Sequence, residues 1–179
     1  DQLDPSSPTL RRQQATLPRD KPLNLVVILE ESLGAQYVGA LGGLDLTPEL
    51  DKLYDEGIAF DRLYAAGTRS VRGIEALLTC ITPRAQLSVV KLSETQDNFF
   101  TLASLLERNG YQTSFIYGGE AHFDNMRQFF MGNGFRTVVD ENDFKDPVFV
   151  APWGVSDEDL FDRAHEEFSK AGEQPFFSL

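Results

Sequence analysis

Two carboxylates follow the first apolar segment of the sequence, where a metal ion could meet them. Glu30 and Glu31 come directly after the apolar run at 25–29. Because that run does not alternate with polar residues, it predicts a strand buried on both faces, as in a parallel sheet. Carboxylate oxygens are ligands that hard divalent cations prefer. Periodicity by itself favours the simpler interpretation, in which both glutamates are solvated loop charges.

Two hydroxyl groups and two arginines lie in a glycine-bearing turn just before a predicted helix. Ser70 and Thr68 lie near backbone N–H groups and the positive end of the helix dipole. That position suits an anionic group under attack by a nucleophile. Arg69 and Arg72 flank the turn and can hold phosphate oxygens. The simpler interpretation, favoured without other evidence, makes Ser70 the N-cap of the helix.

A third polar segment follows the predicted strand at 112–117. After Gly118 and Gly119 it carries His122 and Arg127, which either bind substrate or belong to an ordinary surface helix start. Open parallel sheets bind ligands at the carboxyl ends of their strands. Three polar strand ends in one chain therefore predict a site at that edge.

The elements that must position these residues alternate between strands and helices. Strands are expected at 25–29, 58–64, 112–117, 136–139 and 176–179. Helices are expected at 48–56, from 70 to Ile81 before Pro83, at 99–108, at 123–131 and from Ser156 onward. This alternation predicts an α/β fold with a mostly parallel sheet. Residues 1–22 are proline-rich without periodicity and are interpreted as a linker or extended arm, followed by a domain over 23–179.

Composition excludes some classes of partner and predicts the type of hydrophobic core. The formal net charge of −12 argues against nucleic acid as a partner. Fourteen Phe against one Trp predict a Phe-rich core. Cys80 is the one cysteine, so it forms no internal disulfide, and its helical position predicts a small core residue. His165 is expected to be structural or solvent-facing. No apolar run approaches the ~20 residues that span a bilayer.

Several of these segments together resemble one family, the lipoteichoic-acid-synthase-like, sulfatase-like branch of the alkaline phosphatase superfamily. The run NLVVILEES resembles its first strand and metal-binding carboxylate. The stretch LTPELDKLYDEGIAFDRLYAAGTRSVRGIEALL resembles the part that follows, where a G-T-R-(S/T)-x-R-G turn presents the nucleophile. FIYGGEAHFDNMRQFFMGNGF and WGVSDEDLF also resemble family segments. The resemblance covers 23–179 and implies the N-terminal part of an alkaline-phosphatase-like α/β/α sandwich, truncated here.

Residue by residue, the resemblance implies roles for the polar strand ends. It implies Glu31 as a metal ligand rather than Glu30, and Ser70 as the nucleophile and a second ligand, where the family usually has Thr. Thr68 is the alternative nucleophile. The residues implied for phosphate or substrate contacts are Arg69, Arg72, His122 and Arg127.

One part of the implied site departs from the family pattern. In the synthases a His, a Trp and an Arg near the third motif hold glycerophosphate. Tyr117 and Asp124 stand here at the His and Trp places, with His122 and Arg127 nearby. The substrate is therefore less strongly specified than the class of reaction.

The resemblance also implies cofactors, partners and location. The metal is Mn²⁺ or Mg²⁺, with Zn²⁺ as an alternative, and a downstream Asp–His pair of the family is missing from this chain. A phosphoglycerol-type group would pass from a phospholipid donor to a glycan or lipid acceptor through a covalent intermediate. The enzyme would belong to the cell inner membrane, anchored outside this chain, with its catalytic domain periplasmic or extracellular. The fragment alone is expected to bind metal weakly and to be inactive.

Three alternatives remain open. A phosphoethanolamine transferase or a phosphodiesterase uses the same scaffold. A non-catalytic member would use the fold only to bind an envelope glycan. A sulfatase proper is disfavoured, because the sequence from Cys80 to Arg84 does not have the Cys-x-Pro-x-Arg spacing of a formylglycine precursor.

Overall fold

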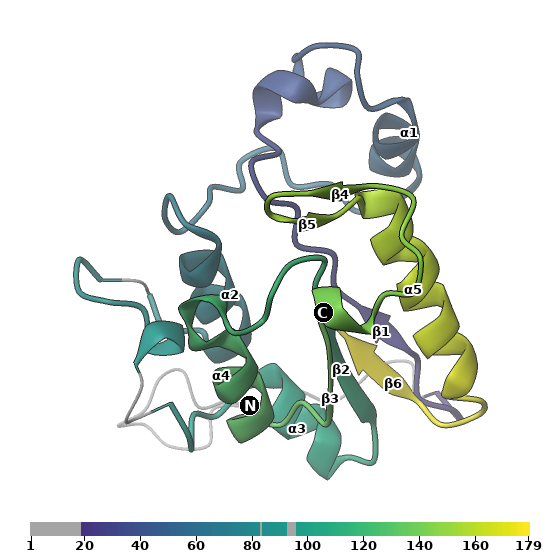
Figure 1. Ribbon diagram of the computed structural model, residues 1–179. Coiled ribbons are helices and arrows are strands. Elements are labelled where there is room, and N and C mark those ends of the chain that lie inside the picture. The colour runs from purple at the N-terminus through teal and green to yellow at the C-terminus, as the bar shows by residue number, and fades with distance from the viewer. Residues whose placement is uncertain (1–18, 83, 93–95) are drawn as a thin grey trace, which may run out of the picture.

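The computed structural model describes residues 19–82, 84–92 and 96–179 (Figure 1). Its main sheet has four parallel strands in the order β1-β6-β2-β3. Their bounds are β1 Leu25–Val26, β2 Gln112–Ile116, β3 Thr137–Val139 and β6 Phe176–Ser178. A separate antiparallel hairpin pairs β4, Val150–Ala151, with β5, Gly154–Val155.

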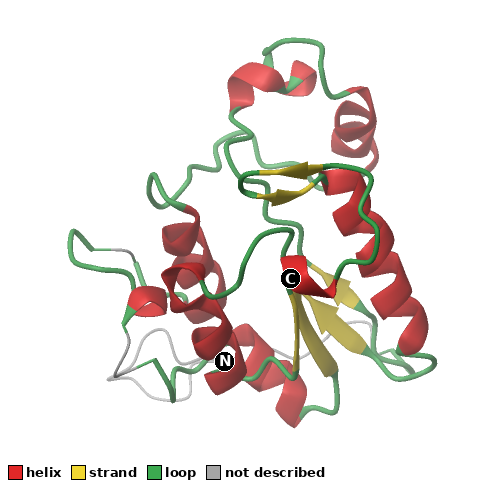
Figure 2. Cartoon of the chain, in the orientation of Figure 1, coloured by secondary structure: helices red, strands yellow, loops and turns green. Residues whose placement is uncertain are grey.

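Helices lie on both faces of this sheet (Figure 2). The α-helices are α1 Pro48–Glu56, α2 Ser70–Thr79, α3 Leu102–Arg108, α4 Met126–Gly132 and α5 Asp157–Lys170. Short 3-10 turns are η1 Ala35–Tyr37, η2 Gly39–Leu41, η3 Val89–Lys91, η4 Phe123–Asn125 and η5 Glu141–Asp143. The predicted α/β/α arrangement with a mostly parallel sheet is confirmed.

Alternation along the strands separates two packed layers. Phe115, Val138 and Phe177 belong to the cluster that α2, α3 and α4 build on one face. The next residues along two of these strands, Ile116 and Val139, pack with α5 on the other face. Because side chains alternate along a strand, β2 and β3 each contribute to both layers.

The larger layer is rich in phenylalanine, as the composition predicts. The residues Phe129, Phe130, Phe135 and Phe177 are fully buried. The ring of Phe130 stacks on Phe115 with centroids 3.6 Å apart and meets Phe135 edge-on at 5.0 Å. Offset and edge-to-face contacts of this kind add to the stabilisation from burial.

The N-terminal strands differ from their predictions. The run at 25–29 was expected to be buried on both faces, yet only Leu25–Val26 is a strand, at the sheet edge, and both residues are exposed. The segment 58–64, expected to be a strand, is irregular, and Ile58 is 89% exposed. Strand structure requires a neighbour that completes the backbone hydrogen bonds. Within the described ranges, no strand pairs with 58–64, and β1 has only β6 beside it.

Two helix boundaries also differ from expectation. The helix that was expected to reach Ile81 ends at Thr79, and Cys80 follows in the left-handed region at φ 57°. Cys80 is therefore exposed, and its prediction as a core residue is wrong. Pro83 lies outside the described residues. Helix α3 starts at Leu102 rather than 99, because Thr101 and Ser104 form a capping box there.

Candidate functional site

The segment that leaves β1 lies against the helix that presents Ser70. The backbone N–H of Val27 donates to the Ser178 carbonyl at 2.8 Å, which continues the β1–β6 pairing. A Cβ added to Gly73 of α2 would meet both Leu29 methyl groups at 3.9 Å. The end of β1, with its two glutamates, is thus joined by packing to the first turns of α2.

Ser70 is the first residue of α2 and not its N-cap. The N-cap position belongs to Arg69, whose backbone is extended and whose side chain makes no capping hydrogen bond within the described part of the chain. Ser70 is half-buried, whereas Thr68 and Arg69 are exposed. The first-turn N–H groups and the helix dipole give this position a positive electrostatic character. The simpler interpretation, in which Ser70 serves as a cap, is therefore wrong.

Arg72 is engaged with the loop that follows α2. Its guanidinium donates to the backbone carbonyls of Arg84 and Gln86. Gly67 lies against the stem of Arg72, where an added Cβ would come within 2.9 Å of the arginine Cβ. Arg72 thus holds the start of α2 against the loop that follows the helix. Its contact with phosphate remains a prediction. Arg69 stays exposed beside it.

Tyr117 marks the carboxyl end of β2. Its N–H donates to the Val139 carbonyl at 3.0 Å. Partial burial raises the pKa of the Tyr117 phenol, and the negative charges of Glu31, then Asp124 and Glu141, raise it further. The phenol therefore stays neutral around pH 7. The structure brings Glu31 into the electrostatic surroundings of the third polar segment, as predicted for residues sharing one sheet edge.

Glu30 has different surroundings. Partial burial raises the pKa of its carboxyl group, and the charge of Asp157 at the start of α5 adds to the effect. The two neighbouring glutamates therefore interact with different parts of the molecule. This difference is consistent with separate roles for Glu30 and Glu31.

The segment from Gly118 to Arg127 is held by ion pairs. Arg127 Nη1 lies 3.1 Å from Asp140 Oδ2, and the Asp140 side chain is 3% exposed. Lys91 Nζ lies 2.6 Å from Asp124 Oδ1. His122 is exposed just before η4. Arg127 therefore has a structural partner, and its predicted contact with substrate remains a prediction, as does that of His122.

Two buried carboxylates were missed by the sequence analysis. Asp140 follows β3 and also accepts hydrogen bonds from the backbone and side chain of Asn142. The rule that singled out Glu31, a carboxylate directly after a strand, could have found it. Glu75 lies within α2 and is 4% exposed, and its buried Oε2 has no hydrogen-bond partner among the residues that the structure describes. No sequence pattern marks Glu75, because its helical position coincides with the apolar face.

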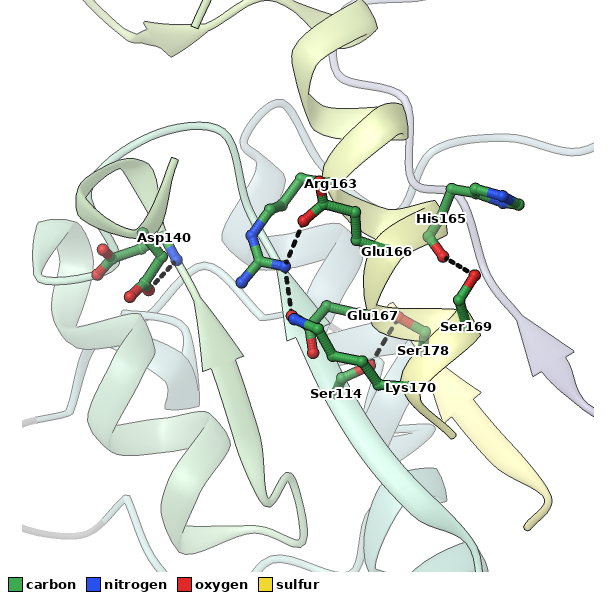
Figure 3. Close-up of polar contacts among 10 residues, drawn as sticks. Ser114, Asp140, Arg163, His165, Glu166, Glu167, Ser169, Lys170 and Ser178 are labelled. Atoms are coloured by element: carbon green, nitrogen blue, oxygen red, sulfur yellow. Dashed lines mark hydrogen bonds and ion pairs between the residues drawn. The ribbon is translucent and has the colours of Figure 1, made fainter. Parts of the chain in front are cut away.

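The second face of the sheet carries a polar network on α5 (Figure 3). Burial would raise the pKa of Glu167, but hydrogen bonds from Lys170 and Arg163 outweigh it, so the pKa is lowered. His165 on this helix is exposed, and its carbonyl accepts from Ser169 Oγ at 2.9 Å. The solvent-facing alternative for His165 is confirmed.

A metal cage is not formed by the described residues. Over 19–82, 84–92 and 96–179, no group of three or more His, Cys, Asp or Glu residues is placed to hold an ion. Glu31 with the Ser70 hydroxyl would offer two ligands, fewer than Mn²⁺ or Mg²⁺ coordination requires. Among the same residues, no helix has the length and hydropathy needed to span a bilayer.

Comparison with curated proteins finds phosphoglycerol transferases. Phosphoglycerol transferase I from Citrobacter koseri is 30% identical over 189 aligned positions, covering 98% of this chain and 24% of the relative. The chain thus spans about a quarter of that relative's length.

Comparison with solved structures finds proteins of the same fold. An alkaline phosphatase superfamily protein from Vibrio parahaemolyticus is 58% identical with a TM-score of 0.86, over 90% of this chain and 40% of that one. The lipoteichoic acid synthase LtaP from Listeria monocytogenes is 22% identical with a TM-score of 0.79, over 88% and 40%. The periplasmic domain of EptC from Escherichia coli, solved with Zn, is 15% identical with a TM-score of 0.63, over 89% and 43%.

A family model matches nearly the whole described chain. The model described as Sulfatase matches residues 23–179, the range over which the sequence motifs run. The resemblance stated from the motifs is thereby confirmed. The chain belongs to the sulfatase family of the alkaline phosphatase superfamily.

Proposed function

We propose that this chain is the N-terminal part of the catalytic domain of a phosphoglycerol-type transferase in the bacterial cell envelope. The observation that carries the proposal is the position of Ser70, a half-buried hydroxyl in the first turn of α2, packed beside the segment that bears Glu31. The curated relative named as a phosphoglycerol transferase supports the transferred group.

In the proposed reaction Ser70 is the nucleophile. Its oxygen attacks the phosphorus of a phospholipid donor, and the lipid alcohol leaves with a proton. The resulting phosphodiester on Ser70 is then attacked by an acceptor hydroxyl of a glycan or lipid, which restores the serine. The first-turn N–H groups of α2 stabilise the negative phosphoryl oxygens, and Arg69 supplies a nearby positive charge.

In this proposal the metal site is complete only in the whole enzyme. Glu31 and the Ser70 hydroxyl would be two ligands of Mn²⁺, Mg²⁺ or Zn²⁺, and the remaining ligands would come from outside the described residues. Such an ion would polarise the phosphoryl oxygens when bound. Location on the periplasmic or extracellular side of the inner membrane, with an anchor outside this chain, is part of the same proposal.

The test is a search for the covalent intermediate on the whole enzyme. Incubation with phosphatidylglycerol followed by peptide mass spectrometry is expected to find glycerophosphate on Ser70. Ser70→Ala should remove both the adduct and turnover, while Ser70→Thr should keep them. Thr68→Ala is the matched control and should keep the adduct.

The outcomes separate the alternatives. An adduct on Thr68 would show that Thr68 is the nucleophile. If the enzyme with both Ser70 and Thr68 present formed no adduct, the result would favour a non-catalytic member. A phosphoethanolamine adduct from phosphatidylethanolamine, with none from phosphatidylglycerol, would change the donor. Release of free glycerophosphate without a phosphorylated acceptor would indicate a phosphodiesterase.

A further inference from the structure

Two polar side chains beside the 3-10 turn η3, those of Ser88 and Gln96, are almost completely buried. Each residue is 1% exposed. This chain produces their burial by itself, so further parts of the fold would not be needed to cover them. A side chain that is covered in this way acts on a substrate only through its neighbours. Because buried polar groups are held by hydrogen bonds, their partners show which segments they join.

Ser88 joins η3 to the start of α2. Its Oγ donates to the Val71 carbonyl at 3.0 Å and accepts a hydrogen bond from the Val90 N–H at 3.3 Å. Val71 follows Ser70 directly in the first turn of α2. The guanidinium of Arg72, in the same turn, is bound to carbonyls of the loop that leads to Ser88. The turn that carries the candidate nucleophile is therefore held from η3 and from the loop before it.

Gln96 joins η3 to the third polar segment, 118–127. Its Nε2 donates to the Val90 carbonyl at 2.5 Å and to the Asn125 carbonyl at 3.2 Å. Lys91 adds a second connection through its ion pair with Asp124. Asp124 and Asn125 have φ of 55° and 59°, in the left-handed region. Such a backbone is uncommon outside glycine and persists only where the surrounding structure holds it.

The turn η3 thus lies between two segments of the candidate site. Val90 is fully buried and belongs to the same core cluster as Val71 of α2 and Met126 of α4. Protein interiors are close-packed and transmit small displacements. A shift at either hydrogen-bonded connection should therefore change the separation between Ser70 and the third polar segment.

We propose that Ser88 and Gln96 are positioning residues, which hold the Ser70 oxygen at the separation from the third polar segment that attack on the donor phosphorus requires. Reacting groups must be aligned at about 3–3.5 Å, and a displacement of ~1 Å can slow a reaction about a hundredfold. The proposal rests on the proposed function, since it takes Ser70 as the nucleophile and the third polar segment as the part that contacts the donor.

The test uses Ser88→Ala and Gln96→Met in the whole enzyme, because both remove hydrogen bonds with little change in side-chain size. Each variant should slow formation of the glycerophosphate adduct on Ser70 about tenfold at saturating phosphatidylglycerol, while the KM for the donor changes by less than about twofold. The double variant should lose at least about threefold less than the product of the two losses, because both residues hold one separation.

Hydrogen exchange supplies a readout that needs no donor. Ser88→Ala should speed exchange in peptides that cover 70–73, and Gln96→Met should speed it in peptides that cover 122–127. If Gln96→Met does not fold, Gln96→Asn, whose amide is one methylene shorter, gives the same comparison.

Thr113→Val is the matched control. Thr113 is 2% exposed, and its Oγ1 donates to the Gly134 carbonyl at 2.7 Å. It lies near the start of β2, at the other end of the strand from the candidate site. The substitution removes a buried hydroxyl of the same kind as that of Ser88, so it should lower stability and leave the rate of adduct formation unchanged.

Three results would overturn the proposal. Equal slowing by Thr113→Val would show a general effect of lost stability. Losses that multiply fully in the double variant would show that Ser88 and Gln96 act independently. Normal adduct formation in folded Ser88→Ala would refute its positioning role while leaving the transferase intact. By contrast, faster exchange in Ser88→Ala with no adduct in the parent enzyme would refute the transferase and leave only the structural connection.

Discussion

Two apolar regions of this chain differ in burial, since one is buried and the other is exposed. The region around β2, β3 and α4 buries its aromatic side chains, with Phe129 and Phe130 fully covered. The region from β1 to residue 64 leaves Ile58 89% and Leu63 81% exposed. Both regions contain apolar runs, so the presence of apolar residues does not by itself explain the difference. What differs is the neighbourhood, because β2 has a strand on each side and helices on both faces, whereas β1 lies at an edge.

The longer solved relative leads to an expectation about what covers the exposed region in the whole protein. The chain spans 40% of the Vibrio parahaemolyticus structure, to which it is 58% identical. We expect the remaining part of that fold to pack on β1 and on 58–64. A large apolar patch left exposed marks a surface for another chain or segment.

The largest expected effect lies in the buried region. Phe130→Ala removes a ring that contacts both Phe115 and Phe135, so it should lower the free energy of unfolding by about 3–5 kcal/mol. Urea denaturation followed by circular dichroism measures the change. A loss below ~1 kcal/mol would mean that this core is not packed as described.

The ion pair between Arg127 and Asp140 should give a smaller effect. Arg127→Ala leaves the buried Asp140 without its cation and should cost about 1–3 kcal/mol in stability. Arg136→Ala breaks an exposed pair with Glu107 and should cost less than ~1 kcal/mol. In the whole enzyme, a rise in KM for the donor with Arg127→Ala, beyond that of the control, would support the predicted substrate contact. Unchanged kinetics would leave Arg127 with a purely structural role.

Tyr117 ends the β2 segment, and the Glu31 charge from the other region adds to the effect of burial in raising its pKa. The folded-state pKa is raised above the ordinary value of 10.0, so stability is fully present below pH 10.0 and is lost as pH rises through the folded pKa. Tyr117→Phe should remove that alkaline loss. Glu31→Gln should reduce it, because the Glu31 charge contributes to the shift. If Glu31→Gln and the parent chain lost stability equally as pH rises, the Glu31 charge would not contribute to the pKa of Tyr117.

The smallest effect is expected in the exposed region. Leu63→Ser should change the stability of the 179-residue chain by less than ~0.5 kcal/mol, since the side chain is already largely in water. In the whole enzyme the same substitution should cost about 2–3 kcal/mol, if the remaining fold buries it. Equal small effects in both proteins would show that 58–64 stays exposed.

Much of the architecture follows from local sequence. Strands β2, β3 and β6 were expected from short apolar runs, and α1 from Thr47 and Pro48, because a proline in the first turn and a glycine after the last turn set boundaries locally. The strand-end rule likewise predicted one shared edge for the segments that follow three of the predicted strands, at Glu30 to Ser32, at Gly67 to Ser70 and at Gly118 to His122. These features depend on a few neighbouring residues and so can be recognised without the rest of the fold.

Other features depend on partners distant in sequence, so they appear only once the chain has folded. Burial of 25–29 and a strand at 58–64 require neighbouring strands, which local hydrophobicity cannot supply. Arg72 was predicted as a phosphate ligand, but its hydrogen bonds to the carbonyls of Arg84 and Gln86 appear only when the loop folds back. The buried pairing of Asp140 with Arg127, and the approach of Trp153 to Gly119, arise in the same way. Residue types and spacing in the sequence identify the residues that are able to do chemistry. Packing of distant segments determines which of these side chains already have partners within the protein, because such contacts are not encoded in any local pattern.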